Sequence, residues 1–128
     1  MELDYIEDID GHEQNIVRLY NFNKAEAIQF RDLLKATVID KKQKLDLAQV
    51  EFITSRNCNL IFGLFKSDEG ILTKDNETFF CILTIEGFEK MIKLIEPFCK
   101  KESKGYQYLY EIDNPTDLLF CPTASFDD

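Results

Sequence analysis

The spacing of apolar residues predicts a first amphipathic helix in the N-terminal third of the chain. After Asn23, apolar side chains recur at helical spacing to about Ile39, and charged side chains occupy the opposite side. Glu26 stands three residues after Asn23, which is the arrangement of a capping box. The sequence therefore predicts a helix that begins after Asn23 and ends near Ile39.

A second helix is expected after Thr84, with one apolar stripe over residues 88–99. Pro97 is expected to end or kink it, because proline has no backbone N–H to donate. The passage CILTIEGFEKMI, residues 81–92, has neither the glycines of a phosphate-binding loop nor the nucleophile of an elbow, so we interpret it as a structural joint. Gly87 is interpreted as an ordinary helical residue, and Gly87→Ala is expected to leave stability unchanged or to raise it by up to about 1 kcal/mol.

Shorter apolar segments predict strands, separated by turn-rich sequences such as SDEG and KDNE. The predicted strands cover residues 15–22, 45–53, 59–65, 78–84 and 105–112, with a short sixth strand at 118–122. Short connections favour antiparallel pairing. The predicted fold is α+β, an antiparallel sheet of five or six strands with two helices in the order β-α-β-β-β-α-β(β).

The central predicted strands are apolar on both faces. Consecutive apolar residues fill 59–65 and 78–84, and Phe62, Phe65 and Phe80 cannot all share one face with Phe79. Two helices can cover one face of such a sheet, but they are too few to cover both faces fully. Either the helices divide between the two faces, or the second face contacts another subunit.

Acidic charge is concentrated at the two ends of the chain. The net charge is −9, from 24 acidic and 15 basic residues; residues 1–13 contain six acidic and no basic residues, and residues 113–128 contain four and none. We expect one domain over 1–128 with flexible acidic ends at about 1–13 and 122–128. The middle is nearly neutral, which argues against nucleic acid and anionic membranes as partners.

The sequence contains no N-terminal apolar segment typical of a secretory signal and no stretch long enough to span a membrane, so a cytoplasmic location is expected. Cys58, Cys81, Cys99 and Cys121 are isolated, with no C-x-x-C pair. We expect four free thiols, and neither a metal nor another cofactor.

No catalytic residue is assigned from the sequence. His12 is the only histidine, and its acidic segment departs from a calcium loop because Glu13 stands where glycine is required. Glu51, Glu111 and Asp113 lie in or near predicted strands, but nothing in the sequence places two of them across a cleft.

The candidate binding residues are Tyr106, Tyr108 and Tyr110, whose spacing of two places them on one face of a strand. A tyrosine buries a large ring while its hydroxyl requires a partner, which suits a protein interface. Packing against neighbouring strands beneath a helix is the other interpretation of this stripe.

Two functional hypotheses follow. In the first, a small cytoplasmic protein without enzymatic activity acts as a protein–protein interaction module, either as a homodimer or as an acidic binder of a basic partner, as a toxin-neutralising immunity protein does. In the second, a small enzyme or ligand-binding protein uses carboxylates and tyrosines in a pocket between sheet and helices. A flat apolar surface favours the first hypothesis, and a deep pocket with two convergent polar groups favours the second.

Overall fold

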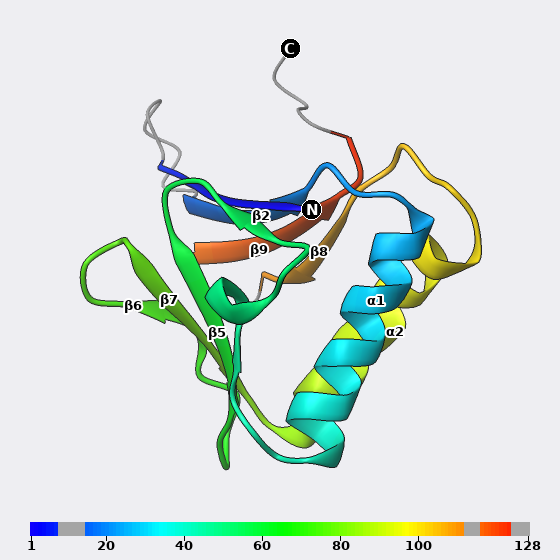
Figure 1. The fold of residues 1–128 in the computed structure, drawn as a ribbon. Coiled ribbons are helices and arrows are strands. Elements are labelled where there is room, and N and C mark those ends of the chain that lie inside the picture. Colours follow the sequence, from blue (N-terminus) through cyan, green and yellow to red (C-terminus); the bar gives the residue numbers. More distant parts are fainter. Residues whose placement is uncertain (8–14, 112–115, 124–128) are drawn as a thin grey trace.

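Two β-sheets and two α-helices surround a shared core in the computed structural model, which describes residues 1–7, 15–111 and 116–123 (Figure 1). Sheet A has the strand order β4-β1-β2-β9-β8, and sheet B has the order β3-β5-β7-β6. The strands of sheet A are β4 (Thr54–Ser55), β1 (Glu2–Ile6), β2 (Asn15–Tyr20), β9 (Thr116–Cys121) and β8 (Gln107–Tyr110). The strands of sheet B are β3 (Leu45–Asp46), β5 (Asn59–Leu64), β7 (Thr78–Leu83) and β6 (Gly70–Thr73).

The α+β class and the two helices are confirmed, but the prediction of one antiparallel sheet is wrong. Both sheets are mixed: β2 pairs with β9 in parallel, and β5 pairs with β7 in parallel. The reason in sheet B is β6, which lies between the turn-rich segments SDEG and KDNE, where no strand is predicted. Strand β6 pairs antiparallel with β7 at the edge of the sheet, so β5 and β7 run in the same direction side by side.

The first helix begins as predicted. In α1 (Lys24–Leu34), Asn23 Oδ1 accepts a hydrogen bond from the Glu26 N–H at 2.9 Å, and Glu26 Oε1 accepts one from the Asn23 N–H at 3.2 Å, which completes the capping box. A π-helical segment, η1 (Lys35–Asp40), continues the helix to within one residue of the predicted end.

The second helix, α2 (Ile85–Lys100), also has its predicted cap and stripe. Thr84 Oγ1 accepts a hydrogen bond from the Gly87 N–H at 3.0 Å, and the predicted apolar stripe is buried. Of the two effects expected of Pro97, an end or a kink, the first is wrong, because the helix continues to Lys100. A proline removes one backbone hydrogen bond, and the two residues that follow Pro97 are buried and continue the last turn.

The predicted strand at 45–53 is mostly not a strand. Only Leu45–Asp46 pairs with β5, and the chain then turns into a short 3₁₀ helix, η2 (Leu47–Gln49). Asp46 Oδ1 accepts a hydrogen bond from the Ala48 N–H at 3.0 Å, and this local bond favours the helical turn over an extended chain.

Residues 1–6 correct the expectation of a flexible acidic N-terminal arm. Strand β1 pairs antiparallel with β2, and Leu3 and Tyr5 alternate into the core. Two of the six acidic residues form ion pairs across the sheet: Asp4 binds Arg18 through two hydrogen bonds of 2.8 and 2.7 Å, and Glu2 binds Arg56. The remainder of that arm, residues 8–14, and the C-terminal residues 124–128 lie outside the described residues.

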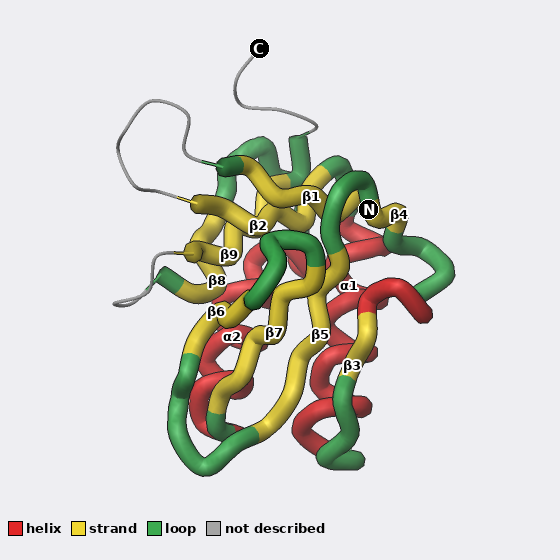
Figure 2. The backbone as a smooth tube through the Cα atoms, turned by 90° about the vertical axis from the view of Figure 1, so that its left-hand side faces the viewer, coloured by secondary structure: helices red, strands yellow, loops and turns green. Residues whose placement is uncertain are grey.

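Both helices pack on the same side of sheet B, and sheet A lies across one end of sheet B and the helix pair (Figure 1). Figure 2 shows sheet B from its other side with both helices behind it. One continuous core contains buried residues from both sheets and both helices. The first of the two alternatives, in which the helices cover opposite faces of the central strands, is therefore excluded.

Among the described residues, no helix is long and apolar enough to cross a membrane.

Substitution of two adjacent residues of β7 tests which face of sheet B packs against the core. Phe79 is fully buried and its ring lies 4.6 Å from that of Tyr5, whereas Phe80 is 37% exposed. Phe79→Ala should lower the free energy of unfolding by about 3–5 kcal/mol through loss of burial and creation of a cavity. Phe80→Ala, measured by the same urea titration at low protein concentration, should lower it by about 1 kcal/mol. Equal losses would contradict the assignment of the two faces.

Candidate functional site

The three candidate tyrosines do not share one face. The pairing of β8 with β9 shifts between Tyr108, which lies opposite Leu119, and Tyr110, which lies opposite Leu118. Such a β-bulge rotates the side chains that follow it. Tyr110 packs against the main core, whereas Tyr108 packs against a small cluster on the outer face of sheet A, the face directed away from the helices.

Tyr106 precedes β8 and is 62% exposed, with its ring at 6.0 Å from that of Tyr108. Partial burial raises the pKa of Tyr108, and the neighbouring carboxylate of Asp117 raises it further. On the same outer face the Arg18 guanidinium lies 4.2 Å from the centre of the Tyr20 ring. The predicted stripe of three tyrosines is therefore a pair, Tyr106 and Tyr108. This pair lies beside sheet A, whereas the central apolar strands β5 and β7 belong to sheet B.

The outer face of sheet B, directed away from the helices, carries most of the exposed large apolar side chains of the described residues. Phe65 is 50% exposed, Leu72 44% and Phe80 37%. The strand register places Ile61, Phe80 and Leu72 side by side across β5, β7 and β6. Ile82 lies next to them, over the position of Gly63. We call Ile61, Phe65, Leu72, Phe80 and Ile82 the sheet B patch.

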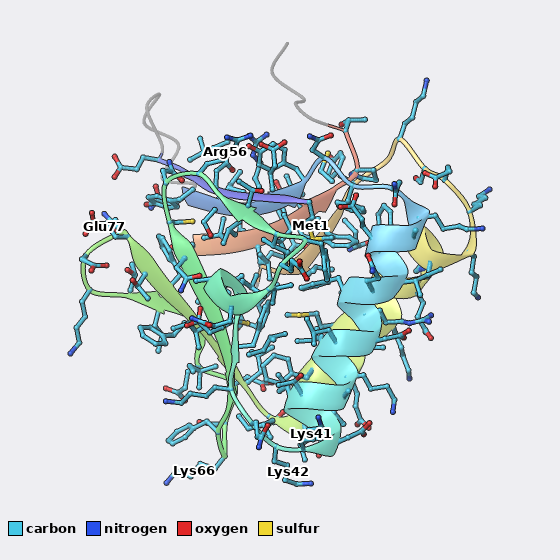
Figure 3. The ribbon with its side chains drawn as sticks, in the orientation of Figure 1. Met1, Lys41, Lys42, Arg56, Lys66 and Glu77 are labelled. Atoms are coloured by element: carbon cyan, nitrogen blue, oxygen red, sulfur yellow. The ribbon has the colours of Figure 1, made fainter. Side chains whose placement is uncertain are left out.

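Charged side chains border the sheet B patch at both edges. Asp46 continues the row beyond Ile61 on β3. Lys74 lies at the opposite edge, where it lines a shallow hollow of about 260 Å³ with Leu72 and Phe80. Lys66 lies at one end of the sheet, with its ammonium 5.9 Å from the centre of the Phe65 ring, and Glu77 lies at the other end (Figure 3).

A second candidate site is a cleft between α2 and β8, with a volume of about 280 Å³. Its apolar wall consists of Leu83, Leu94 and Leu109, of which the first and last are buried. Its polar lining combines charges of both signs with amide and phenol groups: Asp68, Lys90, Gln107, Tyr108, Tyr110 and Glu111. Two of the three candidate tyrosines therefore meet at this cleft, although they belong to different faces of the sheet.

Gly87 forms part of the wall of this cleft, and its surroundings correct its interpretation as an ordinary helical residue. Asp68 Oδ1 accepts hydrogen bonds from the Thr84 N–H at 2.7 Å and from Thr84 Oγ1 at 2.9 Å. A Cβ on Gly87 would lie 2.7 Å from the same Asp68 oxygen and 3.0 Å from Leu83 Cβ. The loop before β6 thus approaches the first turn of α2 so closely that only glycine fits without a shift of its neighbours.

The other residues discussed from the sequence line neither the sheet B patch nor the cleft between α2 and β8. Glu51 is exposed beside η2, and His12, Glu13 and Asp113 lie outside the described residues. Cys58, Cys81, Cys99 and Cys121 are buried free thiols. In the described ranges, no group of three histidine, cysteine or carboxylate side chains is placed to hold a metal ion.

Leu72, Asp68 and Lys90 line these surfaces but were not predicted from the sequence as site residues. A signal for Leu72 was present, because Ile71 and Leu72 form an apolar pair between two turns, which is enough for a short edge strand. Asp68 stands in the turn-rich segment SDEG, and Lys90 stands on the polar side of the second predicted helix. Nothing local indicated that both residues line a cleft.

Comparisons with protein-family models and with curated proteins found no match for this chain.

The contact at Gly87 makes a prediction opposite to that from the sequence. Gly87→Ala should lower the free energy of unfolding by roughly 1 kcal/mol, because overpacking costs 1–3 kcal/mol and exceeds the gain of about 1 kcal/mol from helix propensity. In an Asp68→Ala background the loss should be smaller, as measured by a double-mutant cycle in urea. Stabilisation by Gly87→Ala in the unmodified background would contradict the close approach.

The buried cysteines predict slow thiol chemistry and a loss of stability at high pH. Burial raises the pKa of the Cys58 thiol to about 12, and burial also raises the pKa of Cys81 and Cys99. Unfolded thiols ionise near pH 9 while the folded ones stay protonated, so the free energy of unfolding should fall as the pH rises above 9.

At pH 8, Ellman's reagent should label four thiols in urea and react only slowly with the native protein. Rapid native labelling would contradict this burial.

Proposed function

We propose that the protein is a non-enzymatic interaction module that binds a second copy of itself through the sheet B patch. The observation that carries this proposal is the position of the patch, which covers the side of sheet B opposite both helices. Phe65, Leu72 and Phe80 are all substantially exposed there, and a large contiguous apolar patch is uncommon on the surface of a monomer. A flat apolar surface of this kind is typical of a protein-binding face.

The size of the patch is compatible with a weak dimer. Four strands about 4.8 Å apart and up to about six residues long offer a face of roughly 400 Å². Specific interfaces generally bury at least about 1,000 Å² in total, or about 500 Å² on each partner. The face and its rim together approach this lower limit, so we expect association at micromolar rather than nanomolar concentration.

The charges on the rim favour a second copy over a basic partner. A two-fold axis parallel to the strands places β3 of one protomer over β6 of its partner, and this brings Asp46 towards Lys74 of the opposite chain. Lys44, whose side chain lies close to Gly63, and Lys66 add positive charge to the same face. These lysines would repel a basic partner. The net negative charge of the whole chain is therefore not the charge of this surface.

The acidic-binder hypothesis has less support from the geometry. Glu2 and Asp4, which contribute to the acidic N-terminal segment, are paired with Arg56 and Arg18 on sheet A. Their charges are therefore compensated within the chain, which weakens long-range attraction of a basic protein.

Multi-angle light scattering across a concentration series tests the proposal. The unmodified protein should change from the mass of one chain to twice that mass as its concentration rises through the micromolar range. Phe80→Lys and Leu72→Lys should each keep the protein monomeric, because each places a charge in the buried centre of the interface. Circular dichroism of each variant should remain native, because both side chains are substantially exposed in the single chain.

Tyr106→Lys is the matched control, since it also removes an exposed large side chain but lies beside sheet A. This variant should dimerise as the unmodified protein does. A monomer at every concentration would exclude the proposed self-association. A dimer broken by Tyr106→Lys and unaffected by Phe80→Lys would move the interface to the tyrosine pair.

A further inference from the structure

The cleft between α2 and β8 holds opposite charges that do not neutralise one another. Lys90 is exposed on α2, and Glu111 is exposed directly after β8. Within the described part of the chain, Lys90 forms no ion pair with Glu111, with Asp68 or with Glu86, which stands four residues earlier on the same helix. The ammonium of Lys90 therefore remains available at the cleft.

The two carboxylates at the cleft are also available for a ligand. Asp68 is held in place because its Oδ1 accepts both hydrogen bonds from Thr84, and these bonds do not involve Oδ2. Glu111 forms no hydrogen bond or ion pair with another described residue. A fixed carboxylate, a second carboxylate and an ammonium therefore surround one depression.

The floor of the cleft is apolar and the strand beside it is an edge strand. Leu83 and Leu109 are almost completely buried, and Leu94 lies beside them. Among the strands of the described residues, β8 pairs with β9 alone, and the Gln107 side chain donates a hydrogen bond to the Tyr108 carbonyl at 2.9 Å. Gly87 has no side chain to fill the end of the cleft near Asp68. The depression thus combines an apolar floor with a charged rim, which is the usual construction of a small-ligand site.

From this arrangement we propose that the cleft binds a small zwitterion with an apolar body, in chemical terms an α-amino acid or a dipeptide. The ligand carboxylate binds the Lys90 ammonium, and the ligand ammonium binds Asp68 and Glu111. The apolar part of the ligand lies on Leu83, Leu94 and Leu109. The volume of about 280 Å³ has room for one or two residues and not for a longer folded segment. This site is separate from the sheet B patch and does not depend on dimerisation.

Titration of ¹⁵N-labelled protein with L-leucine and with leucyl-leucine tests the proposal and distinguishes its two sources. Amide signals of Gly87, Lys90 and Leu109 should shift with one saturation curve, while those of the sheet B patch stay in place. Tighter binding of leucine indicates a free amino acid, and tighter binding of leucyl-leucine indicates a peptide. N-acetyl-leucine, which lacks the ammonium, and leucinamide, which lacks the carboxylate, should each bind about tenfold more weakly or not at all.

Substitutions separate a built site from a nonspecific surface. Lys90→Ala and Glu111→Gln should each weaken binding by about tenfold, and Lys93→Ala, an exposed lysine on the same helix that does not line the cleft, should leave it unchanged. Phe80→Lys should bind the same probes normally, so a failure of the dimer proposal would not affect this result. Absence of shifts with either probe, or equal binding of N-acetyl-leucine and leucine, would overturn the proposal.

Discussion

The architecture depends on aromatic contacts that join the two sheets and the helix pair through one core. The ring of Phe120 on β9 lies within 4.2 to 5.8 Å of the rings of Phe22, Phe98 and Phe30, which connects sheet A to both helices. The ring of Phe62 on β5 lies 6.1 Å from those of Phe30 and Phe88, and this connects sheet B to the same helices. Large rings bury much apolar surface for each residue that is ordered, so a few of them fix the relative positions of all the elements.

Strand alternation gives the sheet that closes this core an exposed apolar face on its other side. Because Phe62 and Phe79 point inward, the residues one position away, Ile61 and Phe80, must point outward. The inner face of sheet B is already closed by both helices, and no described helix is available for the outer face. The apolar residues of that outer face contribute little to the monomer, and association is the physical process that would remove them from water.

The parts of the fold that could be predicted from the sequence are those set by local patterns. Helical periodicity and side-chain caps located both helices, because Asn23 and Thr84 act on groups within three residues. Strand β1 was missed because its outward residues Glu2 and Asp4 made the segment look solvated, and their partners Arg18 and Arg56 are distant in the sequence. Parallel pairing and the bulge in β8 are likewise properties of the assembled sheets.

The strand–turn–helix passage at residues 81–92 shows where a local interpretation stops. Its own residues describe a capped helix start, which is correct, and they contain no catalytic motif. The loop that carries Asp68 then adds a carboxylate to the cap from 16 residues away, and the close approach of this loop requires glycine at position 87. The charge and the space at the cleft therefore come from two segments that meet only after folding, so a residue that looks permissive in the sequence is one of the most constrained in the structure.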